Sequence, residues 1–209
     1  MGTQSKWLSV ILLCAMAAAG AAAGLFWRHE QAAPQLATGT RLAPSRALGD
    51  FSLIDSQGRK FGPANLRGRW TILFFGYTNC PDFCPTTLST LAALEKQLRG
   101  EKDAILPQVV FVSVDTKRDT PAQLAKYVPY FDPTFIGLTA TDQASIETVA
   151  KQFGAAVLIT PTPDGAYTVD HSAELFVLDP DGRLAALLSG PFTVQALSGD
   201  WQRITRGPA

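Results

Sequence analysis

The stretch from Trp70 to Pro85 places the tightest limits on how this chain can fold. Trp70 to Phe75 is a continuous apolar run with β-branched and aromatic residues, which is typical of a strand buried on both faces. Gly76 ends the run, and Pro85 can open a helix in which leucines recur at helical spacing up to Gly100. A buried strand that leads into an amphipathic helix indicates an α/β layer structure.

Strands and helices are expected to alternate along the rest of the chain. Short apolar runs predict strands at residues 50–54, 109–114 and 135–138. Helices are expected from Pro121 to about residue 131 with Thr120 as the cap, from a cap at Thr141 to Gly154, and over residues 193–204. The Asp179-Pro180-Asp181-Gly182 turn predicts a β-hairpin between residues 175–178 and 184–188.

The N-terminal segment has the character of a membrane anchor. The chain carries no charge from Trp7 to Trp27, and a helix of this length, at about 1.5 Å per residue, spans a hydrocarbon core. We therefore expect an anchor at 1–29 with a transmembrane helix over 7–27. A cleaved signal peptide stays open, because the alanine-rich stretch inside this run resembles a cleavage site.

The remainder of the chain reads as a linker, one domain and a short tail. Residues 30–47 are rich in Ala, Pro and Thr and are expected to be a flexible linker. Residues 48–204 are expected to form the domain, followed by a tail at 205–209. Eighteen basic and eighteen acidic side chains cancel, so the composition offers no electrostatic footprint for nucleic acid.

Two cysteines and one histidine carry the chemistry expected of the domain. Cys80 and Cys84 lie at i and i+4, on one face of a helix if the segment is helical. Their place near a helix start is expected to lower the thiol pKa. Such a pair can form a structural disulfide, act as a redox dithiol or grip a soft metal. With His171 added the set is one ligand short of a closed zinc site, whereas two thiolates and an imidazole suit copper.

Three motifs, in this order, resemble the Sco/SenC family of copper proteins. The first runs from Phe75-Gly76-Tyr77-Thr78 into Cys80-Pro81-Asp82-Phe83-Cys84-Pro85. The second is Ser113-Val114-Asp115 with Arg118-Asp119-Thr120-Pro121, and the third is Asp170-His171-Ser172 before a strand. The resemblance covers about residues 48 to 200.

This resemblance implies a thioredoxin-like fold, a mixed central sheet with flanking helices, in which Cys80, Cys84 and His171 bind Cu(I), Cu(II) or both. It further implies a copper chaperone, not a conventional enzyme, that receives copper from a donor protein and serves cytochrome c oxidase subunit II. The alternative is a thiol-disulfide oxidoreductase that reduces the cysteines of that subunit through Cys80 and Cys84. A peroxide-reducing thiol enzyme and a purely structural domain are further alternatives.

The expected location follows from this chemistry. We expect a single-pass protein of the bacterial inner membrane with the domain in the periplasm, or alternatively one of the mitochondrial inner membrane facing the intermembrane space. Near the site, Asp115 could contact the metal loop or a docking partner. The alternative is that Asp115, Arg118 and Asp119 form a structural ion pair and helix cap. Tyr77 and Phe83 could shield the site or pack in the core.

Overall fold

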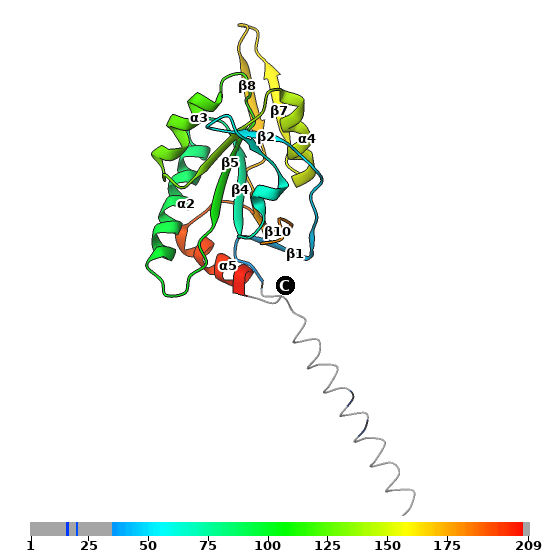
Figure 1. Cartoon of the computed structure of the whole chain (residues 1–209), viewed down its shortest axis with the longest axis vertical. Helices are drawn as coiled ribbons and strands as arrows, with labels where there is room; N and C mark the ends of the chain where they lie inside the picture. The colour runs from blue at the N-terminus through cyan, green and yellow to red at the C-terminus, as the bar shows by residue number, and fades with distance from the viewer. Residues whose placement is uncertain (1–15, 17–19, 21–34, 207–209) are drawn as a thin grey trace, which may run out of the picture. The chain divides into compact units, whose positions relative to one another are not determined.

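The computed structural model describes Met16, Gly20 and residues 35–206, and its centre is an eight-stranded mixed sheet (Figure 1). The strands are β1 (Gly39–Arg46), β2 (Leu53–Asp55), β3 (Lys60–Phe61), β4 (Thr71–Gly76), β5 (Gln108–Ser113), β6 (Ile136–Thr139), β9 (Leu175–Leu178) and β10 (Leu184–Leu188). They are arranged in the order β1-β10-β9-β4-β5-β6-β2-β3. Strands β4, β5 and β6 are parallel, and the other pairings are antiparallel.

Helices cover both faces of the sheet, and a separate hairpin stands beside it. The helices are α2 (Phe83–Arg99), α3 (Pro121–Tyr127), α4 (Gln143–Phe153) and α5 (Val194–Arg206), with the 3-10 turns η1 (Pro63–Leu66) and η2 (Val128–Tyr130). Strands β7 (Val157–Pro161) and β8 (Tyr167–His171) form a two-stranded sheet of their own. Figure 1 shows α2 and α3 on one side of the central strands and α4 on the other.

Strand β4 is buried on both faces, as its apolar run predicts. Ile72 and Phe74 pack in the cluster that contains the leucines of α2 and Trp201 of α5. Leu73 and Phe75 point to the opposite face and pack in the cluster that contains α4. Because successive side chains of a strand alternate between faces, one uninterrupted apolar strand supplies both halves of the core.

Two helix starts differ from the sequence prediction. Helix α2 begins at Phe83 rather than at Pro85, which a first turn tolerates because the N–H that proline lacks has no partner there. Helix α4 is capped by Asp142 rather than Thr141, since the Asp142 carboxylate accepts a hydrogen bond from the Ser145 N–H. The predicted hairpin of β9 and β10 and the cap at Thr120 are confirmed.

The prediction of a flexible linker over residues 30–47 is wrong for its second half. Residues 39–46 form β1, which pairs with β10 at one edge of the sheet. The preceding residues are also held, because the N–H groups of Ala37 and Thr38 donate to the carboxylate of Asp200 in α5. These partners lie far away in sequence, so composition alone did not indicate them.

The predicted transmembrane helix at 7–27 lies, apart from Met16 and Gly20, outside the described residues. No helix within the part of the chain that the structure describes is both long and apolar enough to cross a membrane.

Candidate metal centre

The cysteine loop connects the central strand to its helix. Strand β4 ends at Gly76 and α2 begins at Phe83, so Cys80 lies in the loop and Cys84 in the first helical turn. Cys84 is fully buried and Cys80 half-buried, and both thiols are free. The Cys84 N–H donates to the Cys80 sulfur at 3.4 Å. A helix N-terminus thus places a backbone donor on the more accessible sulfur.

Gly76 makes room for the buried sulfur. A Cβ atom at this position would lie 2.8 Å from the Cys84 Sγ and 2.6 Å from the ring of Phe111. Both distances are shorter than van der Waals contact, so only glycine fits here. The absence of a side chain at Gly76 therefore lets the end of β4 lie close to the Cys84 sulfur.

His171 is the last residue of β8, and its ring faces the cysteines. Its Nε2 lies 3.7 Å from the Cys84 Sγ, while Nδ1 lies 2.8 Å from the carbonyl oxygen of Ser172. A carbonyl oxygen only accepts, so Nδ1 carries the proton and donates it. In the neutral ring Nε2 then presents its lone pair to the sulfurs, as a metal ligand requires.

The two sulfurs and the imidazole nitrogen all lie within 4.8 Å of one another. Among the described residues no other group of three Cys, His, Asp or Glu side chains converges in this way. Residues separated by most of the domain are therefore brought together as the sequence motifs indicate. A set of two sulfur atoms and one imidazole is the donor chemistry of a soft metal ion.

Burial is the largest influence on the pKa values of Cys84 and His171. Burial raises the pKa of the Cys84 thiol, and a hydrogen bond from the Tyr77 backbone offsets this only in part. The expectation of a lowered thiol pKa is therefore wrong for Cys84. Burial also lowers the pKa of His171, against the raising effects of its bond to Ser172 and the nearby Asp170. A neutral imidazole is thus favoured before any metal arrives.

Aromatic side chains flank the imidazole. The Tyr77 ring meets the His171 ring edge-on, with centroids 5.8 Å apart, and the Phe83 ring lies 6.2 Å away at a tilt. Phe83 also contacts Phe192. Packing in the core is confirmed for both, since Tyr77 and Phe83 are each partly buried against a core cluster. Each ring also contacts His171, and shielding of the site stays a prediction.

The acidic residues after β5 have different partners. Asp115 forms an ion pair with Arg118, as expected of a structural pair. Asp119 instead reaches the cysteine loop: its fully buried carboxylate accepts hydrogen bonds from the Thr78 N–H at 2.8 Å and the Thr78 hydroxyl at 2.6 Å. The Ser113 hydroxyl is a third donor at 2.6 Å. Asp119 therefore fixes the cysteine loop from the neighbouring strand end.

Sequence reasoning missed Tyr167, whose hydroxyl donates to the Asp115 carboxylate at 2.8 Å. A signal was present in the chain, because Tyr167, Val169 and His171 alternate with polar residues after an Asp164-Gly165 turn. This pattern is typical of a half-buried hairpin strand.

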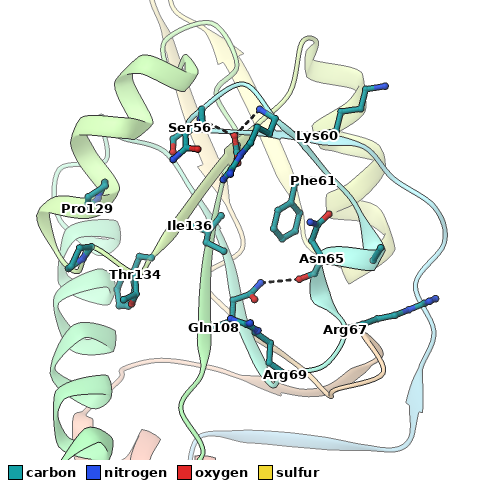
Figure 2. A pocket seen from close by; sticks show the side chains of 16 residues that line it. Ser56, Lys60, Phe61, Asn65, Arg67, Arg69, Gln108, Pro129, Thr134 and Ile136 are labelled. Atoms are coloured by element: carbon teal, nitrogen blue, oxygen red, sulfur yellow. Dashed lines mark hydrogen bonds and ion pairs between the residues drawn. The ribbon is translucent and has the colours of Figure 1, made fainter.

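A cavity in the domain lies away from these residues. It has a volume of about 730 Å³ and is lined by the amino-terminal ends of β5 and β6, including Gln108 and Ile136 (Figure 2). The cysteine loop instead follows the carboxyl end of β4, which runs parallel to β5. Cys80, Cys84 and His171 do not line this cavity. Figure 2 shows Lys60 and Arg67 extending outward at its rim. The metal centre is therefore a separate feature from this hollow.

The chain is similar to one protein family and to several curated proteins. The model of the SCO1/SenC family matches residues 40–206. A protein of Stutzerimonas stutzeri described as copper-binding is 38% identical over 156 residues, covering 75% of this chain and 76% of that protein. The mitochondrial SCO2 homologue of Mus musculus is 37% identical over 160 residues, covering 75% of this chain and 59% of the relative. The chain therefore spans little more than half the length of this mitochondrial relative.

Solved structures agree with the sequence relatives. Arabidopsis thaliana ScoI with copper bound is 36% identical, with a TM-score of 0.70 over 76% of this chain and 98% of that chain. Yeast Sco1 with copper bound is 30% identical, with a TM-score of 0.71 over 78% of this chain and 91% of that chain. The predicted α/β fold with a mixed central sheet and flanking helices is confirmed by these likenesses.

Proposed function

Because the chain belongs to the SCO1/SenC family, we propose that it binds a copper ion between Cys80, Cys84 and His171 and delivers it during assembly of cytochrome c oxidase. The observation that carries this proposal is the convergence of two free sulfurs and an imidazole Nε2 within 4.8 Å. Solved relatives with copper bound support the choice of metal.

The chemistry of the three residues fits copper. Thiolate and imidazole ligands suit both Cu(I) and Cu(II), and the fixed tautomer of His171 leaves Nε2 free to bind. Copper binding requires both thiols to be reduced, because a disulfide cannot supply two thiolates. Ligation would also remove the proton that burial favours on the Cys84 sulfur.

A delivery role is supported by the unequal exposure of the ligands. Cys84 is buried beneath Gly76, whereas Cys80 lies in the loop and is half-buried. An incoming thiolate or imidazole can therefore approach the metal from the side of Cys80 while Cys84 and His171 retain it. We propose subunit II of the oxidase as the acceptor and a separate copper protein as the donor.

The second candidate function is reduction of the subunit II cysteines. It is favoured by the Cys84 N–H, which donates to the Cys80 sulfur and would stabilise a thiolate there. Cys80 would attack the disulfide of the target, and Cys84 would then displace the reduced target by forming the Cys80–Cys84 disulfide. This route needs no contribution from His171.

We further propose that the domain is tethered by the segment at 7–27 to a bacterial inner membrane and faces the periplasm. The alternative is a mitochondrial inner membrane with the domain in the intermembrane space, and relatives that are named as mitochondrial support a mitochondrial location. The orientation can be tested with a reporter enzyme that works only in the cytoplasm, fused after Ala209. The reporter should be inactive, and an active reporter would contradict a periplasmic domain.

The two functions can be separated in one experiment. Full-length protein, reduced and loaded with Cu(I) without oxygen, is mixed with a metal-free, reduced soluble domain of oxidase subunit II, and copper is measured after separation. In parallel, reduced, metal-free protein is mixed with the oxidised subunit II domain, the two proteins are separated, and the free thiols of the subunit II domain are counted. Delivery predicts copper transfer that is lost in His171→Ala. Unchanged thiol reduction by His171→Ala, with no copper transfer by the wild type, would contradict delivery and favour the reductase.

A further inference from the structure

The hairpin that carries His171 is not part of the main sheet. Within the described residues, strands β7 and β8 pair only with each other, and in Figure 1 the hairpin projects beyond the end of the central strands. A two-stranded hairpin on its own is marginally stable in water. The position of His171 therefore depends on how the inward face of β8 contacts the rest of the domain.

The inward face of β8 consists of alternate residues. Tyr167 and His171 are partly buried and Val169 is buried, whereas Thr168 and Asp170 are exposed. Val169 packs in the core cluster that includes Phe153 and Phe176. Tyr167 and His171 thus lie at the two ends of one row of side chains. Contacts that fix Tyr167 therefore also restrain the strand that ends at His171.

Tyr167 is held by the loop after β5. Its hydroxyl donates to the Asp115 carboxylate, which is buried and also paired with Arg118. The Arg118 guanidinium lies 4.3 Å from the centre of the Tyr167 ring, and the Lys117 ammonium lies 5.6 Å from it. A single loop therefore provides the Tyr167 side chain with a carboxylate acceptor for its hydroxyl and with two cation–π contacts to its ring.

The same loop also holds the cysteines. Asp119 accepts two hydrogen bonds from Thr78, which lies two residues before Cys80. Arg118 lies 5.7 Å from the centre of the Tyr77 ring, and Tyr77 in turn contacts His171. Residues 115–119 thus connect the segment that carries the sulfurs to the segment that carries the imidazole.

We infer that Tyr167 is a positioning residue for His171: clamped by Asp115 and Arg118, it sets the distance between the imidazole and the two sulfurs. The inference deepens the proposed copper function. Only its consequence for copper binding rests on that function. The clamp itself is a property of the metal-free protein, so it can be tested without copper.

The first test measures hydrogen exchange in metal-free, reduced, full-length protein. In Tyr167→Ala the amides of residues 157–171 should exchange at least about tenfold faster, because the hydrogen bond and the ring contacts are both lost. Tyr167→Phe keeps the ring and should show a smaller increase. The matched control is Thr168→Ala, which changes the neighbouring exposed side chain of the same strand. Amides of β4 and β5 serve as the internal reference.

The second test adds the metal. With Cu(II) added to reduced protein, Tyr167→Ala should shift the copper absorption spectrum toward that of His171→Ala, and Thr168→Ala should match the wild type. Hairpin exchange in both Tyr167 variants equal to that of Thr168→Ala would overturn the clamp, whatever the copper result. Faster hairpin exchange with no copper bound by the wild type would instead uphold the clamp and contradict the copper function.

Discussion

The sulfur of Cys84 and the Nε2 atom of His171 lie 3.7 Å apart, although the two residues are 87 positions apart in the chain. The first is fixed by the start of α2 beneath Gly76, and the second by the end of β8. Each residue is thus placed by a different part of the fold, so substitutions can perturb the two supports separately.

Substitution of Gly76 should displace the Cys84 sulfur. In Gly76→Ala the new methyl group would overlap the sulfur and the Phe111 ring, which costs about 1–3 kcal/mol of folding free energy and weakens copper binding. Unfolding by urea and competition with a copper chelator measure the two effects. The control is Gly137→Ala, whose methyl group would lie 2.9 Å from the Val128 side chain, away from the site. It should lose stability but keep its copper affinity, and an equal loss of affinity in both variants would contradict the local role of Gly76.

Removal of the Asp119 carboxylate should loosen the cysteine loop. Asp119→Ala leaves the buried Ser113 hydroxyl and the two Thr78 donors without this acceptor, so we expect a loss of about 3 kcal/mol or more of stability. Thr78→Val removes only the hydroxyl contribution and should cost about 1–2 kcal/mol. Urea unfolding compares the variants. Near-equal stability of Asp119→Ala and wild type would show that these bonds contribute nothing to the fold.

The two cysteines should differ in reactivity. Cys84 is buried and its pKa is raised by that burial, whereas Cys80 is half-buried. Iodoacetamide added to the reduced, metal-free protein should therefore alkylate Cys80 first, as peptide mass spectrometry would show. Preferential labelling of Cys84 would mean that the loop opens and would reverse the assignment of Cys80 as the attacking thiol.

Acid should weaken the attachment of the segment before β1. Burial raises the pKa of Asp200, but hydrogen bonds from Thr38 and the Ala37 N–H outweigh it and hold the pKa below its ordinary value. A carboxyl whose pKa is lowered by folding stabilises the protein above its unfolded pKa of about 4, and this contribution is lost as pH falls through the lower folded value.

The corresponding measurement is urea unfolding of wild type and Asp200→Asn between pH 7 and pH 3. The wild type should be more stable by about 1–3 kcal/mol at pH 5 to 7, and the difference should shrink below about pH 4. A difference that stays constant down to pH 3 would show that the charge of Asp200 does not contribute.

Local patterns were enough to predict the central strand, its helix and the two candidate cysteine ligands. The apolar run at 70–75 and the two cysteines that follow it lie within one short stretch, so their physical meaning is local. The turn at 179–182 likewise encodes its hairpin directly, and the structure confirms it. The family motifs then indicated that His171 belongs with the cysteines.

What the sequence did not reveal depends on distant partners. Strand β1 exists because β10 and Asp200 hold a segment whose composition is that of a linker. The raised pKa of Cys84 follows from three-dimensional burial, which a helix-start argument cannot register. Tyr167 gained its role only when the fold placed it against Asp115.

The most direct test of the account is X-ray absorption at the copper edge of reduced, Cu(I)-loaded full-length protein, together with the copper content per chain. We predict one copper ion with two sulfur neighbours and one nitrogen neighbour, and loss of the nitrogen and of most copper affinity in His171→Ala. A spectrum with sulfur neighbours alone, unchanged in His171→Ala, would contradict the assignment of His171 as a ligand and with it the three-residue copper site.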